Sequence, residues 1–202
     1  MISACTGAAI ALFVGACGGG ESDTVDPGSA GSESALTLEE AQADVKKAPP
    51  ELVSIRDEAN EILDEGTDGF DARLAELEAA GIPVVINKWA SWCGPCRDEF
   101  PEFQAQAIER GDEVAFLGLL SNDGPETGET FLSQLPLPYP SYLDSDQEIA
   151  FDRDIQRGFP TTLFIDSDGE VAYTKIGPYS DDPESGVTAE EQLVADIENY
   201  AQ

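Results

Sequence analysis

The sequence contains no histidine among its 202 residues. This absence excludes catalysis by an imidazole base and metal sites that combine cysteine with histidine. It also excludes c-type haem attachment, because Arg97 and not histidine follows the second cysteine of a CxxC pair, Cys93 and Cys96.

Basic residues are scarce as well. Lys and Arg total 10 against 41 Asp and Glu, which gives a formal net charge of −31. Nucleic acid and anionic lipid surfaces repel such a chain, so neither is an expected partner. The acids fall on expected helix faces and loops, as in RDEANEILDEG and YSDDPESG, which indicates a strongly solvated surface.

The beginning of the chain has a short apolar run over residues 8–14, too short to span a bilayer, which needs about 20 residues. Residues 14–17, VGAC, resemble the lipobox of bacterial lipoproteins. The resemblance implies a leader peptide over 1–16, lipidation of Cys17, and an extracytoplasmic protein anchored to the membrane by lipid alone. The run lacks the Lys or Arg that usually precedes it in a signal peptide. A soluble chain with an apolar end is the alternative.

Residues 17–35, with the sequence GGGESDTVDPGSAGSES after the cysteine, predict a flexible acidic tether. We expect a helical extension over 36–69, which packs against the main domain. Its first helix, LTLEEAQADVKK, opens with a capping box, and its second, PELVSIRDEANEIL, has one apolar face. That face consists of Leu52, Ile55, Ala59 and Ile62.

The main domain is expected over 70–202. FDARLAELEAAG predicts a short helix, PVVINKWA a strand buried on both faces, and residues 94–110 a helix that contains Pro101. EVAFLGLL predicts a second strand, ETFLSQL and DQEIAFDRD two short helices, TTLFIDSDGEVAYTKIG a hairpin, and TAEEQLVADIENYA an amphipathic helix. This order of elements predicts an α/β fold with a mixed sheet.

The CxxC pair has four possible roles. Zinc requires four ligands, and the sequence offers neither a second CxxC nor histidine. A thiolate copper site would also require histidine. A purely structural disulfide between residues so close would close a small loop and add little stability.

The fourth role, redox exchange, is favoured by position. Cys93 is expected at the start of a helix that follows a strand, where unpaired N–H groups and the helix dipole stabilise a thiolate. Cys96 lies one turn further, within reach of the first sulfur. Pro95 suits the first helical turn.

NKWASWCGPCRDEFP and GFPTTLFIDSDGEV together resemble the thioredoxin superfamily, specifically its TlpA/ResA-like membrane-tethered thiol-disulfide oxidoreductases. The resemblance covers about residues 70–202 and implies a thioredoxin fold. It implies that Cys93 is the attacking thiol, that Cys96 is the resolving thiol, and that Pro160 has a cis peptide bond.

The resemblance also implies a substrate-binding surface. Phe159, Pro160 and Thr161 would lie against the cysteines, where the backbone of Phe159 can pair with an extended substrate segment. Trp92 would flank the reactive sulfur. The alternative for Trp92 is an aromatic side chain that only covers the helix start.

Four further positions follow from the comparison with this family. Asn87 occupies the place of a buried aspartate in thioredoxins, and Asp123 in LLSNDGPETGETF could instead relay the proton of Cys96. Glu126 is a second candidate, and both acids could simply be solvated loop residues. Lys88 lies in a central strand, so we expect a paired or snorkelling structural residue.

The sequence thus predicts a monomeric cell-envelope enzyme, without a cofactor, that exchanges disulfides with thiol- or disulfide-bearing partner proteins. Gly94 and Pro95 between the cysteines resemble thioredoxin and add no charge, which predicts a reductant supplied with electrons by a membrane thiol relay. Apocytochrome and secreted disulfide proteins are possible partners. The alternatives are a redox-inactive peptide-binding module and a peroxide-reducing enzyme, although the Pro-x-x-x-Thr-x-x-Cys motif of the latter is absent.

Overall fold

The computed structural model describes residues 48–202, so the predicted leader, tether, first helix and Cys17 lie outside the described residues. A six-stranded sheet has the strand order β1-β4-β3-β2-β5-β6. The strands are β1 (Ile62–Leu63), β2 (Val84–Trp89), β3 (Ala115–Ser121), β4 (Ser141–Asp144), β5 (Thr161–Ile165) and β6 (Val171–Ile176). Strands β1 to β4 pair in parallel, and β5 runs antiparallel to both of its neighbours. The predicted mixed α/β sheet is confirmed.

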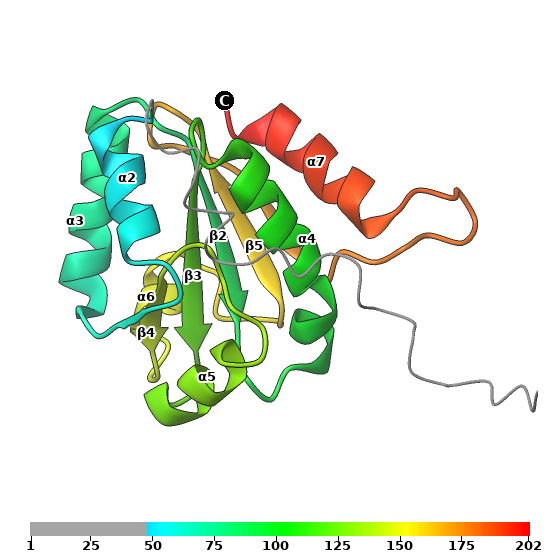
Figure 1. The fold of residues 1–202 in the computed structure, drawn as a ribbon, viewed down its shortest axis with the longest axis horizontal. Helices are drawn as coiled ribbons and strands as arrows, with labels where there is room; N and C mark the ends of the chain where they lie inside the picture. Colours follow the sequence, from blue (N-terminus) through cyan, green and yellow to red (C-terminus); the bar gives the residue numbers. More distant parts are fainter. Residues whose placement is uncertain (1–47) are drawn as a thin grey trace, which may run out of the picture. The chain divides into compact units, whose positions relative to one another are not determined.

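Helices cover both faces of this sheet (Figure 1). They are α2 (Pro50–Asp57), α3 (Gly66–Ala79), α4 (Gly94–Arg110), α5 (Pro125–Leu132), α6 (Glu148–Asp152) and α7 (Ala189–Tyr200). Helices α4 and α7 contact each other, and so do α3 and α6. The predicted boundary between residues 69 and 70 falls inside α3.

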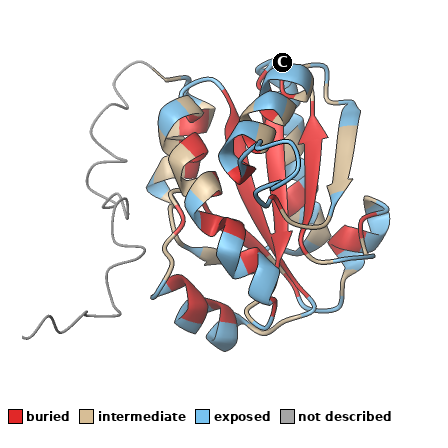
Figure 2. Cartoon of the chain, turned by 90° about the vertical axis from the view of Figure 1, so that its right-hand side faces the viewer, coloured by how far each residue is buried: buried red, intermediate tan, exposed pale blue. Residues whose placement is uncertain are grey.

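Strand β2 is one of the two central strands of the sheet, and all six of its residues are buried. The inner strands of the sheet are red, the colour of buried residues, in Figure 2. Its side chains alternate between the two faces, as in any strand. Asn87 and Trp89 contact residues of α4, whereas Lys88 reaches the segment after α6. The predicted strand buried on both faces is therefore confirmed, and it brings a lysine into the interior.

Helix α4 has the predicted bounds. Cys93 is its N-cap and Pro95 lies in the first turn, where a missing N–H costs nothing. Phe100 is buried against Trp89 of β2, and Phe103 is buried against the ring of Tyr179, which follows β6. Pro101 lies inside the helix.

The second predicted helix ends earlier than the pattern indicated. Helix α2 stops at Asp57, although Leu52 and Ile55 are buried as expected. Asn60 has a left-handed φ of 65°, its N–H donates to Tyr139 O, and its Oδ1 accepts from Leu137 N. These bonds turn the chain toward the sheet, where residues 62–63 form β1 and do not continue a helix.

Strand β4, in the segment SYLD, was not predicted from the sequence. Gly118 of β3 permits its close approach, because a Cβ at this position would lie 2.1 Å from Ser141 Oγ. The same Oγ accepts a hydrogen bond from Trp89 Nε1 at 3.1 Å. This strand therefore depends on contacts across the sheet, which a local pattern does not reveal.

The C-terminal part agrees with the predicted hairpin and helix. Strands β5 and β6 pair antiparallel, and the turn closes with a bond from Gly169 N to Asp166 O. Helix α7 begins with a capping box formed by Thr188 and Glu191.

Candidate active site

Cys93 and Cys96 form a disulfide at the N-terminus of α4, with their Cα atoms 5.3 Å apart. The Cys96 N–H donates to Cys93 Sγ at 3.2 Å, so the first sulfur caps the helix. Cys93 is 4% exposed and Cys96 is fully buried. A partner molecule can therefore approach Cys93 first, and the free N–H groups of the helix start favour a thiolate there.

An aromatic surface lies beside this disulfide. Trp92 is 56% exposed, and its ring packs edge-on against the Phe159 ring with centroids 4.9 Å apart. The Trp92 Nε1–H donates to Asn122 O at 3.1 Å. Phe159 is half-buried, and the bond to the buried Pro160 is cis, as the resemblance implied. Two segments about 67 residues apart in the chain thus meet next to Cys93.

Thr161 follows these residues as the first residue of β5, and its side chain is fully buried. Its hydroxyl donates within its own segment, to Gly158 O at 3.2 Å. The Thr161 hydroxyl is therefore satisfied by the backbone just before it in the chain.

Asp123 organises the loop between β3 and α5. Its carboxylate accepts from Ser91 N at 2.6 Å, from Gly124 N at 2.8 Å and from Thr127 Oγ1 at 2.5 Å. Partial burial acts to raise the pKa of Asp123, but these hydrogen bonds outweigh it and lower the pKa. Such a carboxylate is a weak base, so its clearest role is to hold the segment that leads to Cys93. Glu126 is exposed at the start of α5.

A second carboxyl group lies in the interior. Glu99 is fully buried, one helical turn after Cys96 on the same face of α4. It accepts from Asn87 Nδ2 at 2.9 Å and from Tyr179 N at 3.1 Å. Burial raises the pKa of Glu99 to about 7, against the lowering effect of these two hydrogen bonds. A carboxyl group with this pKa can both accept and release a proton near neutral pH.

Asn87 can accommodate either protonation state of Glu99. Its Oδ1 is buried and has no hydrogen-bond partner within residues 48–202. The orientation of an amide is assigned from its hydrogen bonds, and a half-turn exchanges Nδ2 with Oδ1. In one orientation, Nδ2 donates to the ionised carboxylate of Glu99. In the other, Oδ1 accepts from the protonated carboxyl group. Glu99 was missed in the sequence reasoning, although its position on the buried face of α4, between Cys96 and Phe103, marks it.

Lys88 is fully buried, as its place in the central strand predicted. Its Nζ donates to Ile155 O at 2.6 Å, so the ammonium is paired with a carbonyl and does not snorkel to solvent. The same Nζ lies 4.0 Å from the centroid of the Phe159 ring.

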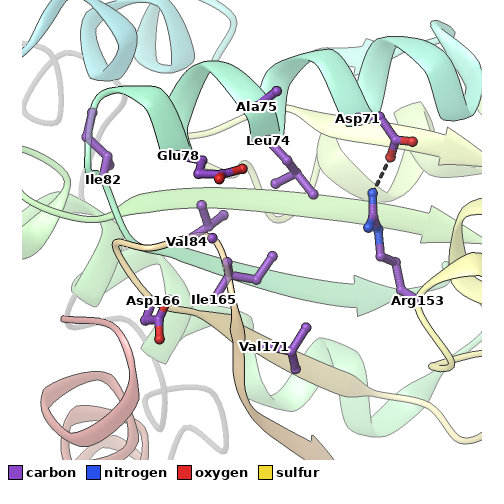
Figure 3. A pocket seen from close by; sticks show the side chains of 11 residues that line it. Asp71, Leu74, Ala75, Glu78, Ile82, Val84, Arg153, Ile165, Asp166 and Val171 are labelled. Carbon is purple, nitrogen blue, oxygen red and sulfur yellow. Dashed lines mark hydrogen bonds and ion pairs between the residues drawn. The ribbon is translucent and has the colours of Figure 1, made fainter.

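In the described part of the chain, residues 48–202, no three Cys, Asp or Glu side chains are grouped so that they could hold a metal ion. No helix within it is both long and apolar enough to cross a membrane. A hollow of about 190 Å³ lies between α3 and the β5–β6 hairpin, with the Asp71–Arg153 ion pair at one end (Figure 3). None of the predicted site residues line it, so the redox chemistry is not expected there.

The CxxC pair at a helix start, after a central strand and beside a cis-proline, defines the thioredoxin-like class of protein. Residues 55–174, more than half of the chain, match the AhpC/TSA family. The protein therefore belongs to this family. The predicted resemblance is confirmed.

Similar proteins support this class. A thiol-disulfide oxidoreductase ResA of Oceanobacillus iheyensis is 33% identical over 115 residues, 54% of this chain and 56% of the relative. A thiol:disulfide interchange protein DsbE of Pseudomonas aeruginosa is 33% identical over 106 residues, 52% of this chain and 57% of the relative. The chain therefore spans just over half the length of these two relatives. A crystal structure of a DsbE from Chlorobium tepidum has 28% identity and a TM-score of 0.50, over 60% of this chain and 83% of that one.

Proposed function

We propose that this protein is a thiol-disulfide oxidoreductase that exchanges disulfides with other proteins. One observation carries the proposal. The disulfide between the slightly exposed Cys93 and the buried Cys96 caps a helix directly beside the exposed Trp92. This arrangement gives one sulfur to a partner and keeps the other for resolution. The names of the ResA and DsbE relatives support the same reaction.

In the reducing direction, the Cys93 thiolate attacks one sulfur of a partner disulfide. The partner S–S bond breaks, one partner thiolate leaves, and a mixed disulfide forms with Cys93. The Cys96 thiolate then attacks Cys93 Sγ and releases the second partner thiolate. The partner gains two electrons, and Cys93 and Cys96 become the disulfide.

The Cys96 thiol must lose its proton before this second attack. We assign the proton acceptor to Glu99 in preference to Asp123. Glu99 is buried on the same helical face as Cys96 with its pKa raised to about 7, whereas hydrogen bonds lower the pKa of Asp123. The choice can be tested, because Glu99→Gln should shift the pH profile of turnover and Asp123→Asn should not.

The direction of exchange, the partners and the anchoring extend the proposal beyond the reaction itself. The neutral Gly94 and Pro95 between the cysteines favour a reductant, which an envelope thiol relay would supply with electrons. The lipobox-like residues 14–17 favour attachment to the membrane through Cys17. Apocytochrome or secreted disulfide proteins are the partners consistent with that location.

The deciding experiment is insulin reduction with dithiothreitol as the electron source. The wild type should accelerate it, and Cys93→Ser should abolish the acceleration. Cys96→Ser should leave Cys93 able to attack and should accumulate a mixed disulfide that nonreducing gel electrophoresis detects. A wild type with no activity that still binds extended peptides would instead be a redox-inactive binding module.

A further inference from the structure

Lys88 places an ammonium group under the surface that carries the disulfide. Strand β2 lies between β3 and β5, and Lys88 is opposite Leu119 on one side and Thr161 on the other. Its Nζ donates to Ile155 O at 2.6 Å and lies 4.0 Å from the centroid of the Phe159 ring. Both partners belong to the segment that connects α6 to β5. One ammonium therefore joins the central strand to this segment at two points.

Packing alone does not require a charge at this position. Burial lowers the pKa of Lys88 to about 8, against the attraction of Asp144. Asp144 accepts from Ser121 Oγ and Ile149 N, and Lys88 forms no ion pair within residues 48–202. Methionine would fill a similar volume without the loss of ammonium hydration. The contacts that only an ammonium can make are the carbonyl hydrogen bond and the attraction to the ring face.

The Phe159 ring lies between the buried Lys88 and the exposed Trp92, and it contacts both. Lys88 approaches the ring from the interior, and Trp92 packs against it from the exposed side, with centroids 4.9 Å apart. Trp92 precedes Cys93 in the chain. The next residue, Pro160, is tied to the sheet because its carbonyl accepts from Gly177 N at 2.9 Å. The ring itself has the Lys88 ammonium beneath it.

We propose that Lys88 is a positioning residue for partner binding: it fixes the Phe159 ring, and through it the Trp92–Phe159 surface on which a partner protein lies during disulfide exchange. Lys88 is buried and touches no partner. The inference rests on the proposed function, and it separates binding from the chemistry of the two sulfurs.

The test compares Lys88→Met with the wild type on two oxidised substrates, insulin and glutathione disulfide, with kcat and KM measured for each. A desolvated ammonium on an aromatic face stabilises an arrangement by roughly a factor of ten or more. We expect the KM for insulin to rise roughly tenfold at nearly unchanged kcat. The rate with glutathione disulfide, which is too small to need the aromatic surface, should stay the same.

Arg153→Met is the matched control. It removes another cation that faces a ring, that of Phe70, at 5.8 Å, together with the ion pair to Asp71 beside the hollow of Figure 3. Both kinetic constants should remain at the wild-type values. An equal rise in the KM for insulin in this variant would overturn the assignment to Lys88.

A double-mutant comparison isolates the contact. In a Phe159→Leu background the ring is gone, so Lys88→Met should add no further rise in KM. If Lys88→Met does not fold, Phe159→Leu alone reports on the contact, and an unchanged KM for insulin refutes the proposal. A wild type inactive on both substrates refutes the proposed function. A wild type active on both, with an unchanged KM in Lys88→Met, refutes only this inference.

Discussion

Replacement of the buried Glu99 by glutamine should stabilise the protein at alkaline pH. Glutamine keeps the volume of the side chain and removes its ionisation. Its Oε1 can accept from Tyr179 N while its Nε2 donates to Asn87 Oδ1, which has no partner within residues 48–202, once the Asn87 amide turns over. The two hydrogen bonds of the carboxylate can thus be replaced, and the main change is electrostatic.

The magnitude follows from the pKa of Glu99. Burial raises this pKa from 4.5 to about 7, and each unit corresponds to about 1.36 kcal/mol. Between these two pH values the folded protein keeps a proton that the unfolded chain has released. The free energy of unfolding therefore falls as the pH rises through this window, by about 3 kcal/mol in total. The Glu99→Gln variant has no ionisable group at this position, so its free energy of unfolding does not fall for this reason.

Urea denaturation of the oxidised proteins at several pH values measures the effect. Relative to its own value near pH 5, the wild type should lose about 2.5 kcal/mol by pH 8 in excess of the variant, because a part of the total loss has already occurred at pH 5. Glu109→Gln, an exposed position on the same helix, is the control and should follow the wild type. Parallel pH dependence of Glu99→Gln and the wild type would refute the argument that burial holds this carboxyl group protonated.

Three more predictions concern separate parts of the chain. Asp123→Asn should lower the free energy of unfolding by about 1 kcal/mol, because the hydrogen bond from Ser91 N is weakened. The same variant should not move the pH midpoint of turnover, and a shifted midpoint would assign the proton relay to Asp123. Equilibration of Cys93 and Cys96 with a glutathione buffer should give a potential nearer that of thioredoxin, about −270 mV, than that of DsbA, about −120 mV, and a value near the latter would make the protein an oxidant. Cys17→Ser should release the protein from membranes with its activity intact, as fractionation would reveal, and a wild type found wholly in the soluble envelope fraction would contradict lipid anchoring.

The sequence predicted the parts of the site whose signals are local. The bounds of α4 followed from a β-branched strand, a CGPC motif and the helical spacing of Phe100 and Phe103. The short strands β1 and β4 escaped prediction, since β4 depends on the space beside Gly118 and on the Trp89 hydrogen bond. Both lie far from β4 in the sequence.

Lys88 and Glu99 show that long-range contacts inside the site could not be predicted from the sequence either. Their burial could be anticipated from a central strand and from a helix face. Their partners could not, because Ile155 and Tyr179 are 67 and 80 positions away. The chemistry of a buried charge depends on those partners, so its role appears only when the fold brings them together.

The two edges of the sheet have a consequence for self-association. An edge strand exposes unpaired N–H and C=O groups to which another chain can add a strand, and short or irregular edges discourage this. One edge here is β1, only two residues long, and the other is β6, whose pairing with β5 shifts register between Phe164 and Ile165. Neither edge offers a long, flat template for aggregation. Within residues 48–202, backbone pairing with other chains along either edge of the sheet is thus discouraged.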